Sequence, residues 1–369
     1  MNPFQTIIAF LIFSISAFGQ KVTYNHIVDT TDTDTQEVME LFGNYLGSIA
    51  QNIRPNPFWN TEEQEMHKNF DFLESEFRPS LYMGLPVHVL SIKFNNNVGQ
   101  IKAQFSYCKE NGVPYVLAIA NYLVKKENGK YKLYNSLTNN KQEWTCTTVG
   151  IVDFYYPKYH KFNYGKAKKL NEFIDKVCEN FGVAPKPFEY FLADDYDEIQ
   201  KLKGIDYYIG MGGKSKPSGK SANDKVYCGG LGEYYAHEAF HIQIDNHFPD
   251  KHFWASEGIA TFLGGSRGKN LNWHIERTNL YLQKHPEINL NNMLKLTNLD
   301  SYTDFHYVLG GLIAKKMYEK GGWDLLKELM SSGKTEVDYY KTIEKHLGIK
   351  KMELNDYIRE QMEIESKKT

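Results

Sequence analysis

The chain has 369 residues, more than one ordinary hydrophobic core accommodates, and this length indicates two domains. Apolar residues make up 41% and charged residues 24% of the chain, a balance that excludes an intrinsically disordered protein. The formal net charge is −2, and no basic patch is interleaved with aromatic residues, so nothing indicates a nucleic-acid-binding protein.

Residues 1–19 have the pattern of a signal peptide. An apolar run from Ile7 to Phe13 leads to small residues near Ala17 and Gly19, as before a cleavage site. The run is shorter than the roughly 20 residues of a membrane-spanning helix, and no cysteine follows it to carry a lipid. The segment lacks Lys and Arg, which weakens the pattern. We therefore expect export to the periplasm or the extracellular space, without a stable membrane anchor after signal removal.

Export changes the interpretation of the four cysteines, because disulfides persist in oxidising compartments. Four cysteines allow three pairings. Their positions suggest one bridge per domain, between Cys108 and Cys146 and between Cys178 and Cys228. The alternative is four free thiols. None of the cysteines has the spacing of a zinc ligand.

Residues 30–145 read as two helices followed by an antiparallel sheet. Amphipathic helices are predicted at 34–51 and 61–77, the second capped by Asn60 or Thr61. Strands are predicted at 87–94, 100–107, 115–124 and 130–137. Glu127-Asn128-Gly129 predicts a hairpin turn between the last two strands. This order of elements resembles the cystatin-like cone of NTF2-like domains. Without a convincing catalytic set, it implies an accessory domain.

Residues 146–164, with Pro157 as a breaker, are expected to form a linker to a second domain at 165–369. That domain opens with a predicted helix at 165–181, whose apolar residues recur with helical spacing. Short strands are predicted at 188–192, 206–209 and 226–228. The Gly-, Lys- and Ser-rich stretch 210–220 reads as a mobile loop.

The second domain contains the run His237-Glu238-Ala239-Phe240-His241, an H-E-x-x-H motif. On a helix, residues four apart share a face, so the two imidazoles can bind one Zn²⁺ ion. Glu238, one step around the helix, is then placed to act as a general base. The rival interpretation is a surface helix that carries two histidines by chance.

A third ligand candidate follows sixteen residues on, in the segment Trp254-Ala255-Ser256-Glu257-Gly258. Residues 247–250 read as a turn, so a second helix can fold back and bring the Glu257 carboxylate to the same ion. The second segment at a workable distance makes a chance occurrence of the motif much rarer. The sequence therefore predicts a zinc centre formed by His237, His241 and Glu257.

With this W-x-x-E-G-x-A-x-F segment, the chain resembles the gluzincins and in particular the peptidase MA-like proteins, over roughly residues 160–369. The resemblance implies an α+β fold in which a small sheet precedes a mostly helical half. It also implies one catalytic Zn²⁺, peptide or protein substrates, and a sheet edge at 226–228 that pairs with the extended substrate. Helices predicted at 289–296, 302–320, 323–331, 337–347 and 351–367 suit the helical half.

Attack on a peptide carbonyl builds negative charge on oxygen, and gluzincins place a Tyr or His there as a donor. Tyr307-Val308-Leu309-Gly310 resembles the Y-x-x-G of the aminopeptidase branch, which makes Tyr307 the first candidate. Tyr302 and His306 are near enough in the sequence to compete with it. All three side chains can equally be packing residues of one helix.

Two departures from the gluzincin pattern limit the resemblance. A G-x-M-E-N segment, which holds a substrate's amino terminus in aminopeptidases, is missing, and Gly210-Met211-Gly212-Gly213 carries no acid. An endopeptidase is therefore favoured over an exopeptidase. No acid that orients a ligand histidine is evident either. Asp245 is possible, but we expect it to face solvent, and we expect His247 and His252 to be surface residues.

The sequence thus favours an exported zinc metallopeptidase in which His237, His241 and Glu257 bind the metal. Glu238 acts as the base and Tyr307 steadies the oxyanion. The alternative is a catalytically silent protein, in which zinc stabilises a scaffold and the N-terminal domain binds a partner. Oligomeric state and substrate preference do not follow from the sequence.

Overall fold

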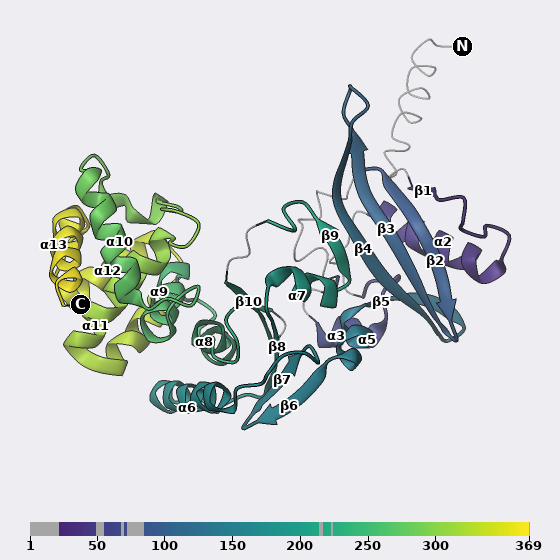
Figure 1. The fold of residues 1–369 in the computed structure, drawn as a ribbon. Coiled ribbons are helices and arrows are strands. Elements are labelled where there is room, and N and C mark those ends of the chain that lie inside the picture. The colour runs from purple at the N-terminus through teal and green to yellow at the C-terminus, as the bar shows by residue number, and fades with distance from the viewer. Residues whose placement is uncertain are drawn as a thin grey trace, which may run out of the picture. The chain divides into compact units, whose positions relative to one another are not determined.

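The computed structural model describes residues 22–48, 55–67, 70–71, 85–213, 217–222 and 224–368 (Figure 1). The chain forms two compact units, the first made of residues up to Glu143 together with Gln200–Gly213. The second comprises Trp144–Ile199 and Lys214–Thr369. Helices and sheets occur in both, as the α+β prediction requires. The predicted signal peptide lies outside the described residues, so export stays a prediction.

Within the described residues, the first unit contains a six-stranded sheet. Its strands are β1 (Val22–Tyr24), β2 (Val87–Asn95), β3 (Val98–Cys108), β4 (Pro114–Glu127), β5 (Lys130–Asn135) and β9 (Ile205–Tyr208). All four strands predicted between residues 87 and 137 are confirmed. Asn128 and Gly129 have φ values of 51° and 79°, as the predicted hairpin turn requires. Register shifts in the β2–β3 and β3–β4 ladders are irregularities of the kind that bend a sheet.

The helices of the first unit are α2 (Thr33–Gly47), α3 (Thr61–Met66), α5 (Leu137–Asn140) and the 3₁₀ turn η2 (Lys141–Glu143). Helix α2 buries Val38, Phe42 and Tyr45 in the unit's core. The prediction of a helix at 61–77 is wrong after Met66, because His67 is already in extended backbone. Residues 68–69 and 72–77 of that range lie outside the described part.

The second unit contains a five-stranded sheet in the order β10-β11-β8-β7-β6. These strands are β6 (Thr145–Val149), β7 (Val152–Tyr156), β8 (Phe188–Ala193), β10 (Ser218–Ala222) and β11 (Lys225–Gly229). Residues 145–156, mostly assigned to a linker above, are therefore a β-hairpin of this sheet. The physical reason is the alternation along β7, which buries Val152, Phe154 and Tyr156 on one face.

Two further predictions about strands need correction. The strand predicted at 206–209 belongs to the first unit, where β9 pairs with β4 and Ile205 enters the core. Residues 218–222, predicted as part of a mobile loop, form β10 and pair antiparallel with β11. Strand β11 also pairs with β8, so it is internal, and β10 holds the sheet edge predicted for residues 226–228.

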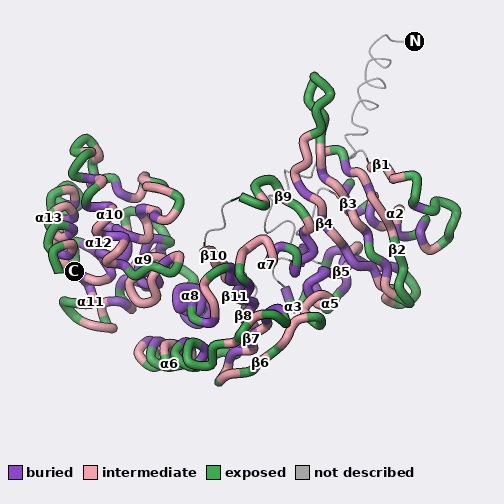
Figure 2. Tube along the Cα trace, in the orientation of Figure 1, coloured by how far each residue is buried: buried purple, intermediate pink, exposed green. Residues whose placement is uncertain are grey.

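The helical part of the second unit packs around a core of its own (Figures 1 and 2). Its helices are α6 (Tyr164–Phe181), α8 (Ala236–Ile244), α9 (Phe253–Gly264), α10 (Leu271–Lys284), α11 (Phe305–Met330), α12 (Glu336–Leu347) and α13 (Leu354–Ser366), with short 3₁₀ turns η3 (Asp245–His247), η4 (Leu290–Lys295) and η5 (Lys351–Glu353). Helix α7 (Tyr196–Leu202) crosses the boundary between the two units in the sequence. Helix α10, capped by Asn270, was not predicted. The helices predicted at 302–320 and 323–331 are confirmed as the two arms of α11, which are separated by non-helical backbone at Gly321 and Gly322.

The disulfide hypothesis is wrong, because none of the four cysteines, all of which lie in the described part of the chain, is in a disulfide. Cys178 and Cys228 are buried in the second unit, and each has a polar partner of its own. The Cys178 thiol contacts the Gln243 side chain at 3.7 Å, and the Cys228 thiol contacts the Gly232 carbonyl at 3.6 Å. Within the described residues, no helix combines the length and apolar character needed to span a membrane.

Candidate metal centre

Helix α8 places the H-E-x-x-H residues in a buried setting. Its residues Ala236, Ala239 and Phe240 pack into the hydrophobic cores, which fixes the rotation of the helix about its axis. His237 is only 2% exposed and Glu238 only 8%. The chance alternative of a solvated surface helix is therefore excluded.

The structure brings together His237, His241 and Glu257, and their ligand atoms all lie within 4.8 Å of one another. The Nε2 atoms of His237 and His241 are 3.2 Å apart. Glu257 Oε2 lies 3.2 Å from His237 Nε2, and Glu257 Oε1 lies 3.7 Å from His241 Nε2. Tetrahedral zinc with bonds of about 2.0–2.1 Å separates its ligands by about 3.3–3.4 Å, so this triangle fits the ion.

The opposite nitrogen of each imidazole is held by a partner of its own. His237 Nδ1 lies 2.8 Å from the Gly265 carbonyl oxygen, to which it can only donate. His241 Nδ1 lies 3.2 Å from Asp245 Oδ2, and Ser256 Oγ donates to the other carboxylate oxygen at 2.7 Å. These contacts orient both rings so that their Nε2 atoms face the shared point.

Asp245 therefore orients a candidate ligand histidine, which corrects the expectation that it faces solvent. It lies four residues after His241, so the α8–η3 turn brings both side chains to one face. Burial raises the pKa of Asp245, but the hydrogen bond and charge of His241 outweigh burial and lower it. The carboxylate thus stays ionised beside the ring that it orients.

The electrostatics of the triangle favour a cation. Burial alone raises the pKa of Glu257, but the adjacent His241 and His237 hold it well below its usual value. Burial lowers the pKa of His241, and the charges of Glu257 and Asp245 reverse this and raise it well above its usual value. The three groups therefore stabilise a positive charge among them.

Two glycines explain how Glu257 reaches the histidines. A Cβ atom on Gly258 of α9 would lie 2.4 Å from the Gly310 carbonyl carbon of α11. A Cβ atom on Gly310 would lie 2.8 Å from the Trp254 carbonyl oxygen. The two helices therefore touch backbone to backbone at this point. Glu257 and Tyr307 flank this contact, and the glycines of both motifs set their separation.

Glu238, the predicted base, is held by strand β10. The backbone N–H of Ser221 donates to Glu238 Oε2 at 2.7 Å. A Cβ atom on Gly219 of the same strand would lie 2.2 Å from the Tyr235 ring, so β10 lies directly on the start of α8. The support that β10 gives to Glu238 was not predicted, because residues 210–220 have the composition of a loop.

The three oxyanion candidates are separated by their surroundings. The Tyr307 ring meets the His237 ring edge-on, with centroids 5.6 Å apart. His306 Nδ1 pairs with Asp304 at 2.5 Å, and its ring packs against Phe253. The Tyr302 ring contacts Trp273, 6.2 Å between centroids. Of the three candidates, Tyr307 is the one whose ring contacts a metal-ligand candidate.

His274 lies near the site and was not predicted as part of it. It is fully buried on α10, and its Nε2 lies 3.2 Å from the Ser266 carbonyl oxygen. Its Nδ1 lies 2.9 Å from Thr303 Oγ1. Burial lowers the pKa of His274 to about 4, so the ring is neutral at pH 7. His274 thus joins the turn that follows α9 to the segment that precedes α11.

The two other histidines near the site, His247 and His252, differ in their exposure to solvent. His247 is exposed, as predicted. His252 is buried, which corrects the expectation of a surface residue: its Nδ1 accepts the Trp254 N–H at 3.2 Å. It thereby caps α9, and its ring stacks on Tyr339 with centroids 4.6 Å apart.

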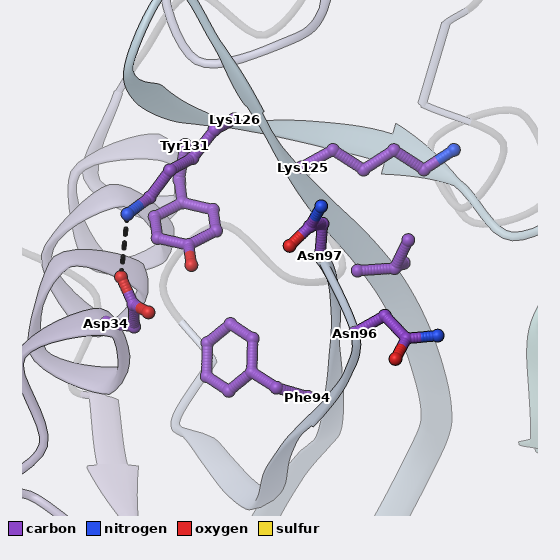
Figure 3. A pocket seen from close by; sticks show the side chains of 8 residues that line it. Asp34, Phe94, Asn96, Asn97, Lys125, Lys126 and Tyr131 are labelled. Carbon is purple, nitrogen blue, oxygen red and sulfur yellow. Dashed lines mark hydrogen bonds and ion pairs between the residues drawn. The ribbon is translucent and has the colours of Figure 1, made fainter.

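The first unit has a pocket of about 600 Å³ near the tips of its hairpins (Figure 3). Lys126 pairs with Asp34 at 2.8 Å across it, and Lys125 extends away from that pair. Both charged partners are nearly half exposed, and such a pair contributes little binding energy of its own. The pocket does not gather the converging ligand atoms that mark the second unit.

No protein-family model matches the sequence, and no curated protein resembles it. Solved structures similar to the chain include an M1 zinc metallopeptidase from Deinococcus radiodurans, at 11% identity and a TM-score of 0.30, over 76% of this chain and 63% of that chain. A mutant of that enzyme gives 10% identity and a TM-score of 0.31, over 76% and 64%. A two-domain M1 zinc metallopeptidase mutant bound to L-arginine gives 8% and 0.31, over 76% and 63%.

The chain spans about 63% of the length of these enzymes. TM-scores of 0.30 and 0.31 do not establish a shared fold. We therefore interpret the site from its own geometry alone.

Proposed function

We propose that this protein is a zinc-dependent hydrolase of peptide bonds, with one Zn²⁺ ion held by His237, His241 and Glu257. The observation that carries the proposal is the triangle of 3.2, 3.2 and 3.7 Å among their ligand atoms. Two neutral imidazoles and one carboxylate are the donor set of catalytic zinc sites that keep an open position. A zinc ion bound there polarises a carbonyl group and makes water more acidic.

Glu238 receives the proton in this proposal. Its carboxylate follows His237 on α8, and the Ser221 N–H at 2.7 Å leaves its second oxygen available. Beside the metal position, that oxygen can accept a proton from water and later give it to the departing amine.

Tyr307 donates the hydrogen bond to the oxyanion. Burial raises the pKa of its hydroxyl, and the negative charge of Glu257 raises it further. The hydroxyl therefore keeps its proton at neutral pH and remains a donor. A donor already in place where charge develops stabilises the transition state more than the ground state.

Strand β10 supports extended peptides as the substrates. It pairs with β11 on one side, and its other side is the edge of the sheet among the described residues. A peptide added to this edge would run past Ser221, which holds the base. We assign the first unit an accessory role as an NTF2-like domain at about residues 30–145. We also retain export and internal cleavage of peptides as parts of the proposal.

The experiment is cleavage of a mixed peptide pool by the purified protein, with zinc removed by a chelator and then restored. Activity is expected to disappear and return, while Glu238→Gln retains zinc and loses at least about a hundredfold in kcat. Wild-type turnover by Glu238→Gln would contradict the mechanism. A zinc-loaded wild-type protein that stays inactive would favour the alternative, a zinc-stabilised scaffold.

A further inference from the structure

Phe253 is an exposed aromatic residue at the start of α9, the helix that carries the carboxylate of the candidate metal centre. Of the phenylalanines that the structure describes, Phe253 and Phe94 alone are exposed, and Phe253, at 56%, is the more exposed of the two. The nearest phenylalanines on either side in the sequence, Phe248 and Phe262, both pack against the core of the helical part. The start of α9 is capped by His252. The Phe253 ring therefore adds little to the core or to the cap of its helix.

Helical spacing places Phe253 beside the metal centre. It lies four residues before Glu257, and both residues belong to α9. Residues four apart on a helix share a face, with about 5–6 Å between their Cβ atoms. The Glu257 carboxylate lies 3.2 Å from His237 Nε2. The face of α9 that carries Phe253 is therefore the face that meets the metal centre.

A row of rings leads to the same place through α11. The Phe253 ring packs against the His306 ring, with centroids 5.0 Å apart. The His306 ring contacts the Tyr307 ring at 4.2 Å between centroids, and the Tyr307 ring contacts His237. The row begins at a ring in solvent and ends at a metal-ligand candidate. Contacts from two helices thus place Phe253 at the rim of the candidate site.

The polar groups around Phe253 have partners within the fold. His306 Nδ1 donates to Asp304 Oδ1 at 2.5 Å, and the His306 backbone N–H donates to the same oxygen at 3.2 Å. The ammonium group of Lys251, two residues before Phe253, donates to the Asp245 carbonyl at 3.0 Å. These contacts hold the His306 ring in place as a support and engage the neighbouring charges. The surface that remains for a ligand is the apolar ring of Phe253.

We propose that Phe253 binds an apolar side chain of the peptide substrate, within a few residues of the bond that is cut. This inference rests on the proposed function and adds a substrate class to it. An extended peptide advances about 3.3 Å per residue, so a spacing of about 5–6 Å on α9 corresponds to about two residues of substrate. Contact with an apolar side chain removes both surfaces from water, and an aromatic side chain adds a ring contact. Substrates with Phe, Leu or Met near the cleaved bond are therefore preferred.

The test measures peptide binding to zinc-loaded Glu238→Gln protein. Fluorescent peptides built of Ala and Ser carry Phe, Leu or Ser at one position, and that position is moved along the peptide. We expect Phe or Leu to strengthen binding about tenfold or more over Ser at the best position. Phe253→Ala, introduced into the same protein, should remove this preference and leave the affinity for the Ser peptide unchanged. Phe253→Leu should retain most of the preference, because leucine keeps an apolar surface there.

Leu280→Ala is the matched control, since Leu280 on α10 is an apolar residue of the same unit and is 60% exposed. It should preserve the preference for Phe and Leu. Phe253→Ala should also keep the melting temperature of the parent protein, because the ring is exposed.

Two results would overturn the inference. One is equal affinity of the Glu238→Gln protein for the Phe, Leu and Ser peptides, including no binding of any, or an equal loss for all of them on Phe253→Ala. The other is a change from dimer to monomer in sedimentation on Phe253→Ala, since a second copy of the chain would then cover the ring.

The outcomes separate this inference from the proposed function. An apolar preference lost with Phe253→Ala, in a protein whose wild type never cleaves peptides, supports Phe253 and overturns the peptidase assignment alone. Cut sites in a mixed peptide pool, read by mass spectrometry, should be enriched in Phe, Leu or Met at one position near the cleaved bond. Zinc-dependent cleavage without that enrichment, or with an enrichment that Phe253→Ala leaves intact, overturns the role of Phe253 alone.

Discussion

Both units bury a glutamate and a histidine close together, but they use them differently. In the first unit, Glu63 and His67 lie four residues apart with 3.6 Å between Glu63 Oε2 and His67 Nε2. Each Glu63 oxygen accepts a hydrogen bond, one from Asn135 at 2.8 Å and the other from Thr138 at 3.2 Å. The requirements of this carboxylate are met within the fold, as in a structural polar cluster.

In the second unit, the polar partners of His237 and His241 contact the ring nitrogens that point away from the shared centre. Gly265 and Asp245 hold the Nδ1 atoms, and the Nε2 atoms of His237 and His241 face each other at 3.2 Å. Two facing imidazole nitrogens and a carboxylate satisfy one another poorly, and a cation at their centre would complete them. Convergence of ligand atoms, rather than burial of polar residues, therefore distinguishes a metal site from a structural cluster.

The largest expected effect on activity comes from Tyr307, the proposed oxyanion donor of the second unit. Tyr307→Phe should lower kcat about a hundredfold to a thousandfold while zinc content is unchanged, because one oxyanion donor is lost. Tyr302→Phe and His306→Gln serve as controls and should retain near wild-type kcat in the same steady-state assay. A larger loss with either control would move the oxyanion role to that residue.

Glycines give a second contrast between the units. Gly258→Ala should destabilise the protein by about 1–3 kcal/mol and reduce bound zinc, since the new methyl group forces α9 away from α11. Gly43→Ala in helix α2 meets nothing within 4 Å and should stabilise the first unit by about 0.5–1 kcal/mol. Denaturant unfolding and metal analysis measure both. Equal effects of the two substitutions would rule out the backbone contact.

The third test concerns Asp245, which contacts the Nδ1 atom of His241. Asp245→Asn should weaken zinc binding about 10–100-fold in a chelator competition, because His241 loses the carboxylate that orients it. The exposed Asp250, whose ion pair with Lys334 is at 2.9 Å, provides the control substitution Asp250→Asn. Unchanged zinc affinity of Asp245→Asn would return Asp245 to the role of a surface residue.

Particular elements show how much of the fold and of the candidate site could be predicted from the sequence. The H-E-x-x-H spacing was readable because helical geometry fixes which side chains share a face. Glu257 was readable because the turn at 247–250 lets the next helix fold back toward the first. Asp245 carried the same i,i+4 signal after His241. Strand β10 had none, because its sequence Ser-Gly-Lys-Ser-Ala lacks apolar alternation, and its pairing is set by β11.

The remaining corrections arise from contacts distant in the sequence. Strand β9 joins β4 through Ile205 and its neighbours, and local pattern cannot reveal which sheet a strand enters. The strand pattern of 152–156 was present, but Pro157 directed the interpretation to a linker. Cysteine pairing was argued from position in the chain alone, and a bridge depends on distance in space.

The smallest expected effect is a pH trend with opposite signs in the two units. Burial raises the pKa of Glu365 on α13, but Lys315, Lys316 and Lys368 outweigh it and lower it to about 2. The stability that this carboxylate contributes is present above its usual pKa of 4.5 and is lost as the pH falls toward 2. Burial raises the pKa of Glu63, so its contribution is lost as the pH rises above 4.5.

Thermal unfolding between pH 2 and 7 measures both trends. Glu365→Gln should flatten the loss of stability on the acid side of the profile, and Glu63→Gln should flatten the loss of stability above pH 4.5. A profile that neither substitution changes would show that these carboxylates titrate alike in the folded and unfolded chain.

The most direct test of the metal centre is elemental analysis of the purified protein beside its Glu257→Ala variant. The geometry predicts about one zinc per wild-type chain and a small fraction of that in the variant, with both proteins folded by circular dichroism. A folded wild-type protein that fails to bind zinc when zinc is supplied, or a variant that retains one full equivalent, would contradict the central claim.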